Sequence, residues 1–133
     1  MANTNTLVRM ADGNLNRVVY FTLNSDGSEE TALVIYDSSA FQGTDMLNCK
    51  IMRIWYSFNA AAITATAKLL WNATTNVLAL PLVPNMTKEL NFDRVGGLNN
   101  QGGSGITGDI LLTTTGLTSG DSIMIVLEVK NVA

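Results

Sequence analysis

Apolar and polar side chains alternate along much of this chain with a period of two residues, and that period decides what the chain can fold into. Side chains two positions apart lie on the same face of a β-strand. Over residues 63–71 the apolar set is Ile63, Ala65, Ala67, Leu69 and Trp71. Over residues 50–58 it is Met52, Ile54, Tyr56 and Phe58. No segment sustains the 3.6-residue apolar period of a helix, so the sequence predicts strands.

Seven more segments are rich in β-branched, aromatic or alternating residues and are predicted strands. They are Leu7–Met10, Val18–Leu23, Thr31–Asp37, Val77–Leu82, Thr87–Phe92, Asp109–Thr115 and Ser122–Val129. The polar segments Asn24–Ser28 and Gly116–Asp121 are predicted hairpin turns. Pro81 and Pro84 place their segment at a sheet edge or strand end, because proline cannot donate a ladder hydrogen bond.

These elements predict one all-β domain over residues 7–133, preceded by a polar arm over residues 1–6. The expected architecture is an antiparallel, jelly-roll-like β-sandwich of about eight or nine strands with no substantial helix. A chain of 133 residues is long enough to bury a core without disulfides or metal.

Several function classes are disfavoured by composition. The chain has no histidine, so the commonest proton shuttle near neutral pH is missing, and we expect no enzymatic activity and no catalytic residues. Its eight basic residues are scattered, which argues against direct binding of nucleic acid. Cys49 is the single cysteine and is expected to be a buried hydrophobe. The longest apolar stretch, residues 77–84, is too short to span a bilayer, so no membrane partner is expected.

Two motifs match ligand-binding sites by letter. Residues 103–108 read G-x-G-x-x-G, but a strand rather than a helix is predicted to follow, so a loop is favoured over a dinucleotide site. Residues 24–30 carry acidic and amide oxygens, yet they miss the spacing of a calcium loop, and a solvated turn is favoured. We therefore expect no cofactor and no metal, zinc included, since Cys49 is the lone candidate soft ligand.

Apolar residues also stand on the strand faces that point away from the predicted core. A sheet face in water should be polar at those positions. Ile123, Ile125, Leu127 and Val129 share one face of the last strand, whereas Met124 and Val126 lie on the other. We therefore predict contact with other subunits, and the alternative is a closed sandwich that is merely poor in charge. The candidate interface residues are Ile51, Arg53, Trp55, Leu111, Met124 and Val126.

Aromatic residues raise a further alternative, a lectin-like module that stacks sugars on Trp55, Tyr56 and Trp71. Tyr56 and Trp71 lie on the predicted core faces, so core packing is favoured for these two. Trp55 is on the opposite face, beside Arg53, and remains a candidate for binding.

The chain as a whole resembles small virion structural proteins of tailed bacteriophages, especially capsid decoration or cement proteins. The resemblance lies in the Asn/Thr-rich strands, the Gly-rich loop Gly96–Gly105 and the closing segment Leu117–Val129. It implies a non-enzymatic sandwich, commonly a homotrimer, that binds the major capsid protein and stabilises the shell. A tail, neck or fibre component is the alternative within the virion.

The same resemblance implies a location on the capsid surface. Residues 1–6 have neither the cationic start nor the apolar stretch of a signal peptide, so we expect synthesis in the host cytoplasm without secretion. This polar arm would become ordered on contact with a neighbouring subunit.

Overall fold

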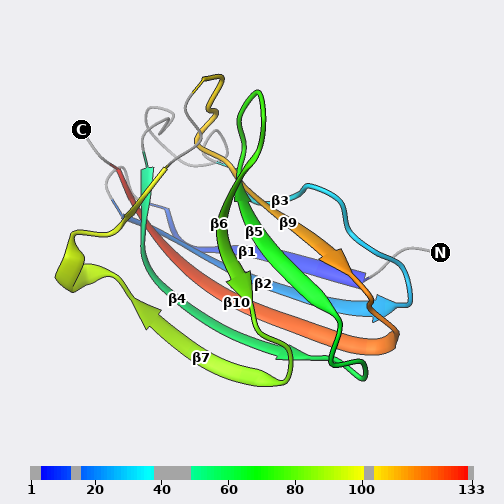
Figure 1. Cartoon of the computed structure of the whole chain (residues 1–133). Coiled ribbons are helices and arrows are strands. Elements are labelled where there is room, and N and C mark those ends of the chain that lie inside the picture. The colour runs from blue at the N-terminus through cyan, green and yellow to red at the C-terminus, as the bar shows by residue number, and fades with distance from the viewer. Residues whose placement is uncertain (1–3, 13–15, 38–48, 101–103, 132–133) are drawn as a thin grey trace.

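The computed structural model describes residues 4–12, 16–37, 49–100 and 104–131, and within them two antiparallel sheets face each other across a hydrophobic core. Figure 1 shows β3, β9, β5 and β6 as one layer and β1, β2, β10, β4 and β7 as the other. The all-β sandwich predicted from the two-residue period is therefore confirmed. Its jelly-roll form stays a prediction.

Ten strands and one short helix make up the described part of the chain. They are β1 (Thr4–Asp12), β2 (Asn16–Asp26), β3 (Leu33–Tyr36), β4 (Cys49–Asn59), β5 (Thr66–Trp71), β6 (Val77–Leu82), β7 (Met86–Asn91), the 3-10 helix η2 (Asp93–Val95), β8 (Leu98–Asn99), β9 (Ile110–Thr115) and β10 (Ser119–Asn131).

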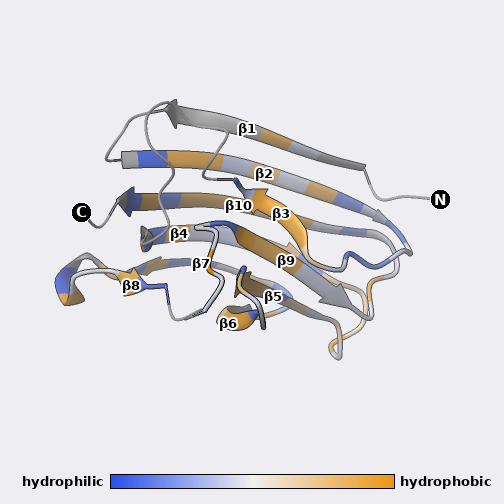
Figure 2. Ribbon diagram, turned by 90° about the horizontal axis from the view of Figure 1, so that it is seen from above, coloured by the Kyte–Doolittle hydropathy of each residue, from blue (hydrophilic) through white to orange (hydrophobic). Residues whose placement is uncertain are grey.

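The larger sheet, called sheet A here, has the strand order β1-β2-β10-β4-β7, with β8 paired to β4. The smaller one, sheet B, has the order β3-β9-β5-β6. Figure 2 shows the strands of sheet B lying across sheet A, with β1 beyond the area that they cover. Leu7 of β1 is accordingly exposed, although its register partner on β2, Phe21, is buried.

The core lies between the sheets and is formed by alternate residues of each strand. On β4 the predicted inward residues Met52, Ile54, Tyr56 and Phe58 are all buried, and Ile51 is buried as well. On β10 the inward set is Ile123, Ile125, Leu127 and Val129. Trp71 of β5 is fully buried in the same core cluster. The edge position predicted for the proline-bearing segment is also confirmed, because β6, which contains Pro81, ends sheet B.

Some strand boundaries differ from the prediction. Strand β5 begins at Thr66, and Ile63 lies in the preceding turn with 84% of its surface exposed, so its assignment to the core face was wrong. Thr4 pairs with Asn24 in β1, so the predicted polar arm is shorter than residues 1–6, and residues 1–3 lie outside the described part. The Gly-rich stretch also contains the short strand β8, which the sequence did not predict.

Two predicted hairpins were wrong in a way that defines the fold. The predicted turns lie between β2 and β3, which residues 27–32 separate, and between β9 and β10, which residues 116–118 separate. In both cases the first and second strands belong to different sheets. These segments therefore cross from one sheet to the other instead of joining neighbours, and we call them arches.

Carboxylates hold the second arch at both ends. Glu29 accepts hydrogen bonds from the backbone N–H groups of Gly116 and Leu117. Asp121 is buried and accepts from the Thr118 N–H at 2.9 Å and from the Ala61 N–H at 3.0 Å. Charged acceptors satisfy backbone donors that leave the sheet at this point. The sequence predicted that Asp121 lies in a turn, but it did not predict the hydrogen bond from the Ala61 N–H.

A buried cation lies at the other end of the core. Arg17 of β2 is fully buried between the sheets, and its Nη1 donates to the Tyr36 hydroxyl of β3 at 3.2 Å. The bond links an inward residue of sheet A with one of sheet B. A buried guanidinium is tolerated only where its donors are satisfied, and the bond to Tyr36 satisfies one of them while joining the two sheets.

Candidate functional site

The outer face of sheet A presents three rows of side chains that run across its central strands. The rows follow from strand register, because directly paired residues lie on the same face. The first row is Tyr20, Val126, Trp55 and, on β7, Glu89; the second is Thr22, Met124, Ser57 and Thr87; the third is Asn24, Ser122 and Asn59. On β2, β10 and β4 the face therefore changes from aromatic and apolar in the first row to amide and hydroxyl in the third.

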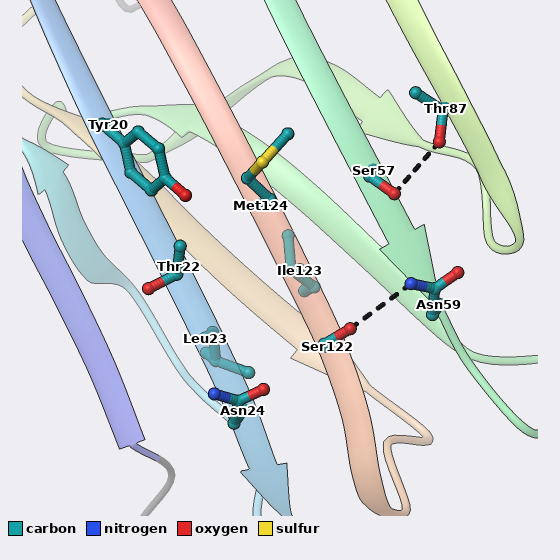
Figure 3. Close-up of a pocket in the computed structure, with 10 residues that line it drawn as sticks. All are labelled: Tyr20, Thr22, Leu23, Asn24, Ser57, Asn59, Thr87, Ser122, Ile123 and Met124. Atoms are coloured by element: carbon teal, nitrogen blue, oxygen red, sulfur yellow. Dashed lines mark hydrogen bonds between the residues drawn. The ribbon is translucent and has the colours of Figure 1, made fainter.

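A groove of about 510 Å³ opens on this face, over the second and third rows. Figure 3 shows Tyr20 and Met124 at one end and the amides Asn24 and Asn59 at the other. Thr87 donates to the Ser57 hydroxyl at 3.1 Å, and the Asn59 amide donates to Ser122 at 3.4 Å. Every side chain that lines the groove is uncharged.

Charged groups gather at the opposite end of the same face. The Arg53 guanidinium carbon lies 6.0 Å from the centre of the Trp55 ring. In the register, Arg53 is opposite Glu128, and Trp55 is opposite Glu89. Arg53 and Glu128 thus lie beyond the first row, and Glu89 ends that row on β7, so none of the three lines the groove.

Four of the six predicted interface residues share this face. Arg53, Trp55, Met124 and Val126 are all partly exposed on β4 and β10. Ile51 is not among them, since it is fully buried. The reason is a β-bulge: Arg53 pairs with Glu128 but Ile51 pairs with the adjacent Val129, so the extra residue reverses the alternation and turns Ile51 inward.

Leu111 belongs to a different surface. It lies on β9 in sheet B, outside the core cluster, opposite Val34 on one side and Leu70 on the other. Leu70 in turn pairs with Leu78 of β6. We call Val34, Leu111, Leu70 and Leu78 the sheet B row. Leu111 itself is only 3% exposed, but Val34 and Leu78 at the ends are 39% and 49% exposed.

The predicted sugar platform is not assembled. Tyr56 and Trp71 are buried in the core, as the two-residue period indicated. The Tyr56 hydroxyl accepts a hydrogen bond from the Val83 N–H at 3.2 Å, which satisfies it inside the protein. Trp55 alone of the three lies on an outer face. Tyr20, which the sequence analysis did not single out, stands on the same row, and the period-two pattern of β2 could have indicated it.

The acidic segment 24–30 forms an internally bonded turn. Ser25 Oγ accepts from the Gly27 N–H at 2.9 Å, and Asp26 Oδ1 accepts from the Ser28 N–H at 3.0 Å. Hydrogen bonds from Ser28, its side chain first and then its backbone, hold the pKa of Asp26 below the ordinary 3.8. Within the described ranges, no three acidic or thiol side chains are grouped so that they could hold a metal ion.

The lowered pKa of Asp26 gives this turn a pH-dependent stability. A carboxylate with a depressed folded-state pKa stabilises the protein above its unfolded pKa and loses that contribution as pH falls through the folded value. We therefore expect wild type to exceed Asp26→Ala in free energy of unfolding at about pH 6, with the gap closing below about pH 4. Urea titrations of both proteins across this range measure it. A gap that widens on acidification would contradict the assignment.

The glycine-rich motif packs as a structural loop. Gly105 has a φ of +77°, and an added Cβ would lie only 2.1 Å from the Thr74 hydroxyl. The Thr74 N–H donates to the Ser104 carbonyl, so the loop lies against the β5–β6 turn. Strand β9 follows it, so no helix N-terminus is available for a pyrophosphate. Gly103 and the side chain of Cys49 lie outside what the structure describes.

No protein-family model matches the chain, and no curated protein matches it. Among the described residues, no helix is long and apolar enough to cross a membrane. The function therefore has to be argued from the two outer faces.

Proposed function

We propose that this protein is a non-enzymatic structural component of a phage virion that acts through contacts between subunits. The observation that carries the proposal is the sheet B row, where Val34 and Leu78 stand exposed on either side of Leu111 and Leu70. Exposed aliphatic side chains that gather on one sheet face can mark a contact surface, and here Val34 and Leu78 reach solvent while Leu111 between them is buried.

The composition of the row favours a protein partner. Its four members are aliphatic, and Leu78 is on the edge strand β6, where a second subunit can approach without disturbing the sheet. Charged residues are depleted at the centres of subunit interfaces, and this row contains none. Another copy of this chain is the first partner proposed, in a homotrimer, and the major capsid protein is the second.

The resemblance to capsid decoration proteins supports the more specific role. A sandwich placed on the shell would contact neighbouring capsid subunits and bury apolar surface against them. The free energy of that burial would help to hold the subunits together against internal pressure. A tail, neck or fibre component would use the same kind of contact at another position in the virion. Labelling the protein in assembled particles and locating it by electron microscopy separates these two positions.

Oligomeric state tests the contact itself. We expect wild type to sediment as an oligomer and Leu78→Asp to dissociate it, with a rise in the dissociation constant of about tenfold or more, since a charge would have to enter an apolar interface. Sedimentation velocity and native mass spectrometry measure the change. The matched control is Ile63→Asp, which places the same charge on another exposed apolar residue outside the row.

Two results would overturn the proposed contact. One is a wild-type protein that stays monomeric at high concentration and does not bind capsid shells. The other is an oligomer that Leu78→Asp leaves unchanged while Ile63→Asp disrupts it.

A further inference from the structure

The groove on the outer face of sheet A lies on the side of the sandwich away from the sheet B row. It therefore stays open when the sheet B row is covered. From its lining we infer that it binds an uncharged pyranose sugar, as part of a neutral glycan. This site is separate from the subunit contact proposed above and does not depend on it.

The polar part of the groove matches the hydrogen-bonding character of a sugar. Asn24, Ser122 and Asn59 form the third row, and the hydroxyl groups of Thr22, Ser57 and Thr87 belong to the second. Hydroxyls and amides both donate and accept, as sugar hydroxyls do. Asn59 is exposed, and its bond to Ser122 uses one of the amide's two N–H groups, which leaves the second N–H and the carbonyl oxygen for a ligand.

The apolar part of the groove matches the other side of a sugar ring. Tyr20 is partly exposed next to Met124, and Figure 3 shows its ring flanking the upper end of the groove. A pyranose presents a face of C–H groups that packs on an aromatic ring, while its hydroxyls point sideways. A ring that lies against Tyr20 and Met124 would direct its hydroxyls toward Asn24 and Asn59.

Charge selects among ligands that share this polarity. The lining contains no cationic side chain, so a phosphate, sulfate or carboxylate would lose its hydration without gaining a partner. Arg53 is the nearest cation along β4, and it lies beyond Ser57 and Trp55, opposite Glu128. A neutral glycan is thus favoured over a nucleotide or an acidic sugar. The groove is open, which suits a residue within a longer chain.

Titration with defined sugars tests the inference. The probes are maltose, cellobiose and chitobiose, with sialyllactose as the acidic comparison, each followed by chemical-shift changes in ¹H–¹⁵N NMR spectra. We expect at least one neutral disaccharide to bind with a dissociation constant of about 1 mM, as an open site that buries few ligand atoms would give. The shifts should map to β2, β10 and the end of β4, and sialyllactose should bind no better.

Variants separate this site from the subunit contact. Tyr20→Ala should weaken binding about tenfold, Tyr20→Phe should keep most of it, and Asn24→Ala should weaken it without risk to the core, because Asn24 is exposed. Leu78→Asp should bind sugar as wild type does, whatever its oligomeric state.

Three outcomes would overturn the inference. They are no shift with any neutral disaccharide at about 10 mM, well above the expected dissociation constant; equal binding by wild type and Tyr20→Ala; and loss of the oligomer in Asn24→Ala. The last would mean that another subunit covers this face. If Leu78→Asp does not change the oligomeric state, the subunit contact is contradicted but the sugar-binding result is unaffected. The two proposals can therefore be rejected independently.

Discussion

Replacing Arg17 with alanine is expected to lower the free energy of unfolding by about 3–5 kcal/mol. Arg17 is among the largest fully buried side chains of the described residues, so truncation leaves a cavity between the two sheets. It also removes the donor to the Tyr36 hydroxyl, which is itself buried on β3. The two losses act at the same point, where β2 of sheet A meets β3 of sheet B. Urea unfolding followed by far-UV circular dichroism measures the effect.

Two further variants divide the effect of Arg17 into its parts. Arg17→Met keeps most of the side-chain volume without the charge, so it should lose less stability than Arg17→Ala. Tyr36→Phe removes only the hydroxyl acceptor and should cost about 1 kcal/mol. If Arg17→Ala unfolds within about 1 kcal/mol of wild type, the guanidinium does not hold the sheets together.

Asp121→Ala should lower the free energy of unfolding by about 2–4 kcal/mol. The carboxylate accepts from the N–H groups of Thr118 and Ala61 and from the Thr118 hydroxyl, at 2.9, 3.0 and 3.2 Å. Its removal orphans backbone donors beside the core, in the arch between β9 and β10 and in the segment before β5. An unmade bond at a buried donor costs more than an ordinary hydrogen bond contributes.

The conservative variant distinguishes hydrogen bonding from general disruption. Asp121→Asn keeps one carbonyl oxygen and should lose about half as much stability as Asp121→Ala. Thermal unfolding of the two variants beside wild type measures the difference. Hydrogen exchange at Ala61 and Thr118 gives a local readout, since both N–H groups should exchange faster in Asp121→Ala. Unchanged exchange at these two positions would contradict the role assigned to the carboxylate.

The candidate surfaces were only partly predictable. Four predicted interface residues lie on one outer face because they alternate with core residues along β4 and β10. They are Arg53, Trp55, Met124 and Val126. Ile51 departs from that rule because β4 has one extra residue between Arg53 and Ile51, opposite Glu128 and Val129. Such a bulge depends on how β4 pairs with β10. Tyr20 and Asn24 enter the groove because β2 pairs with β10, and that partnership joins segments about 100 residues apart.

Local periodicity, by itself, determined that the chain is all β, which residues of β5 and β10 and of β4 from Ile54 onward face the core, and that proline-bearing β6 lies at an edge. These properties depend on side chains two residues apart or on the missing N–H of proline, so a short segment of sequence is enough to predict them. The tertiary structure decided which strands pair, and that residues 27–32 and 116–118 cross between the sheets. A polar turn between two strands has the same local sequence whether it joins neighbours or spans the core. The choice is made by distant contacts, such as those of Arg17 with Tyr36 and Asp121 with Ala61.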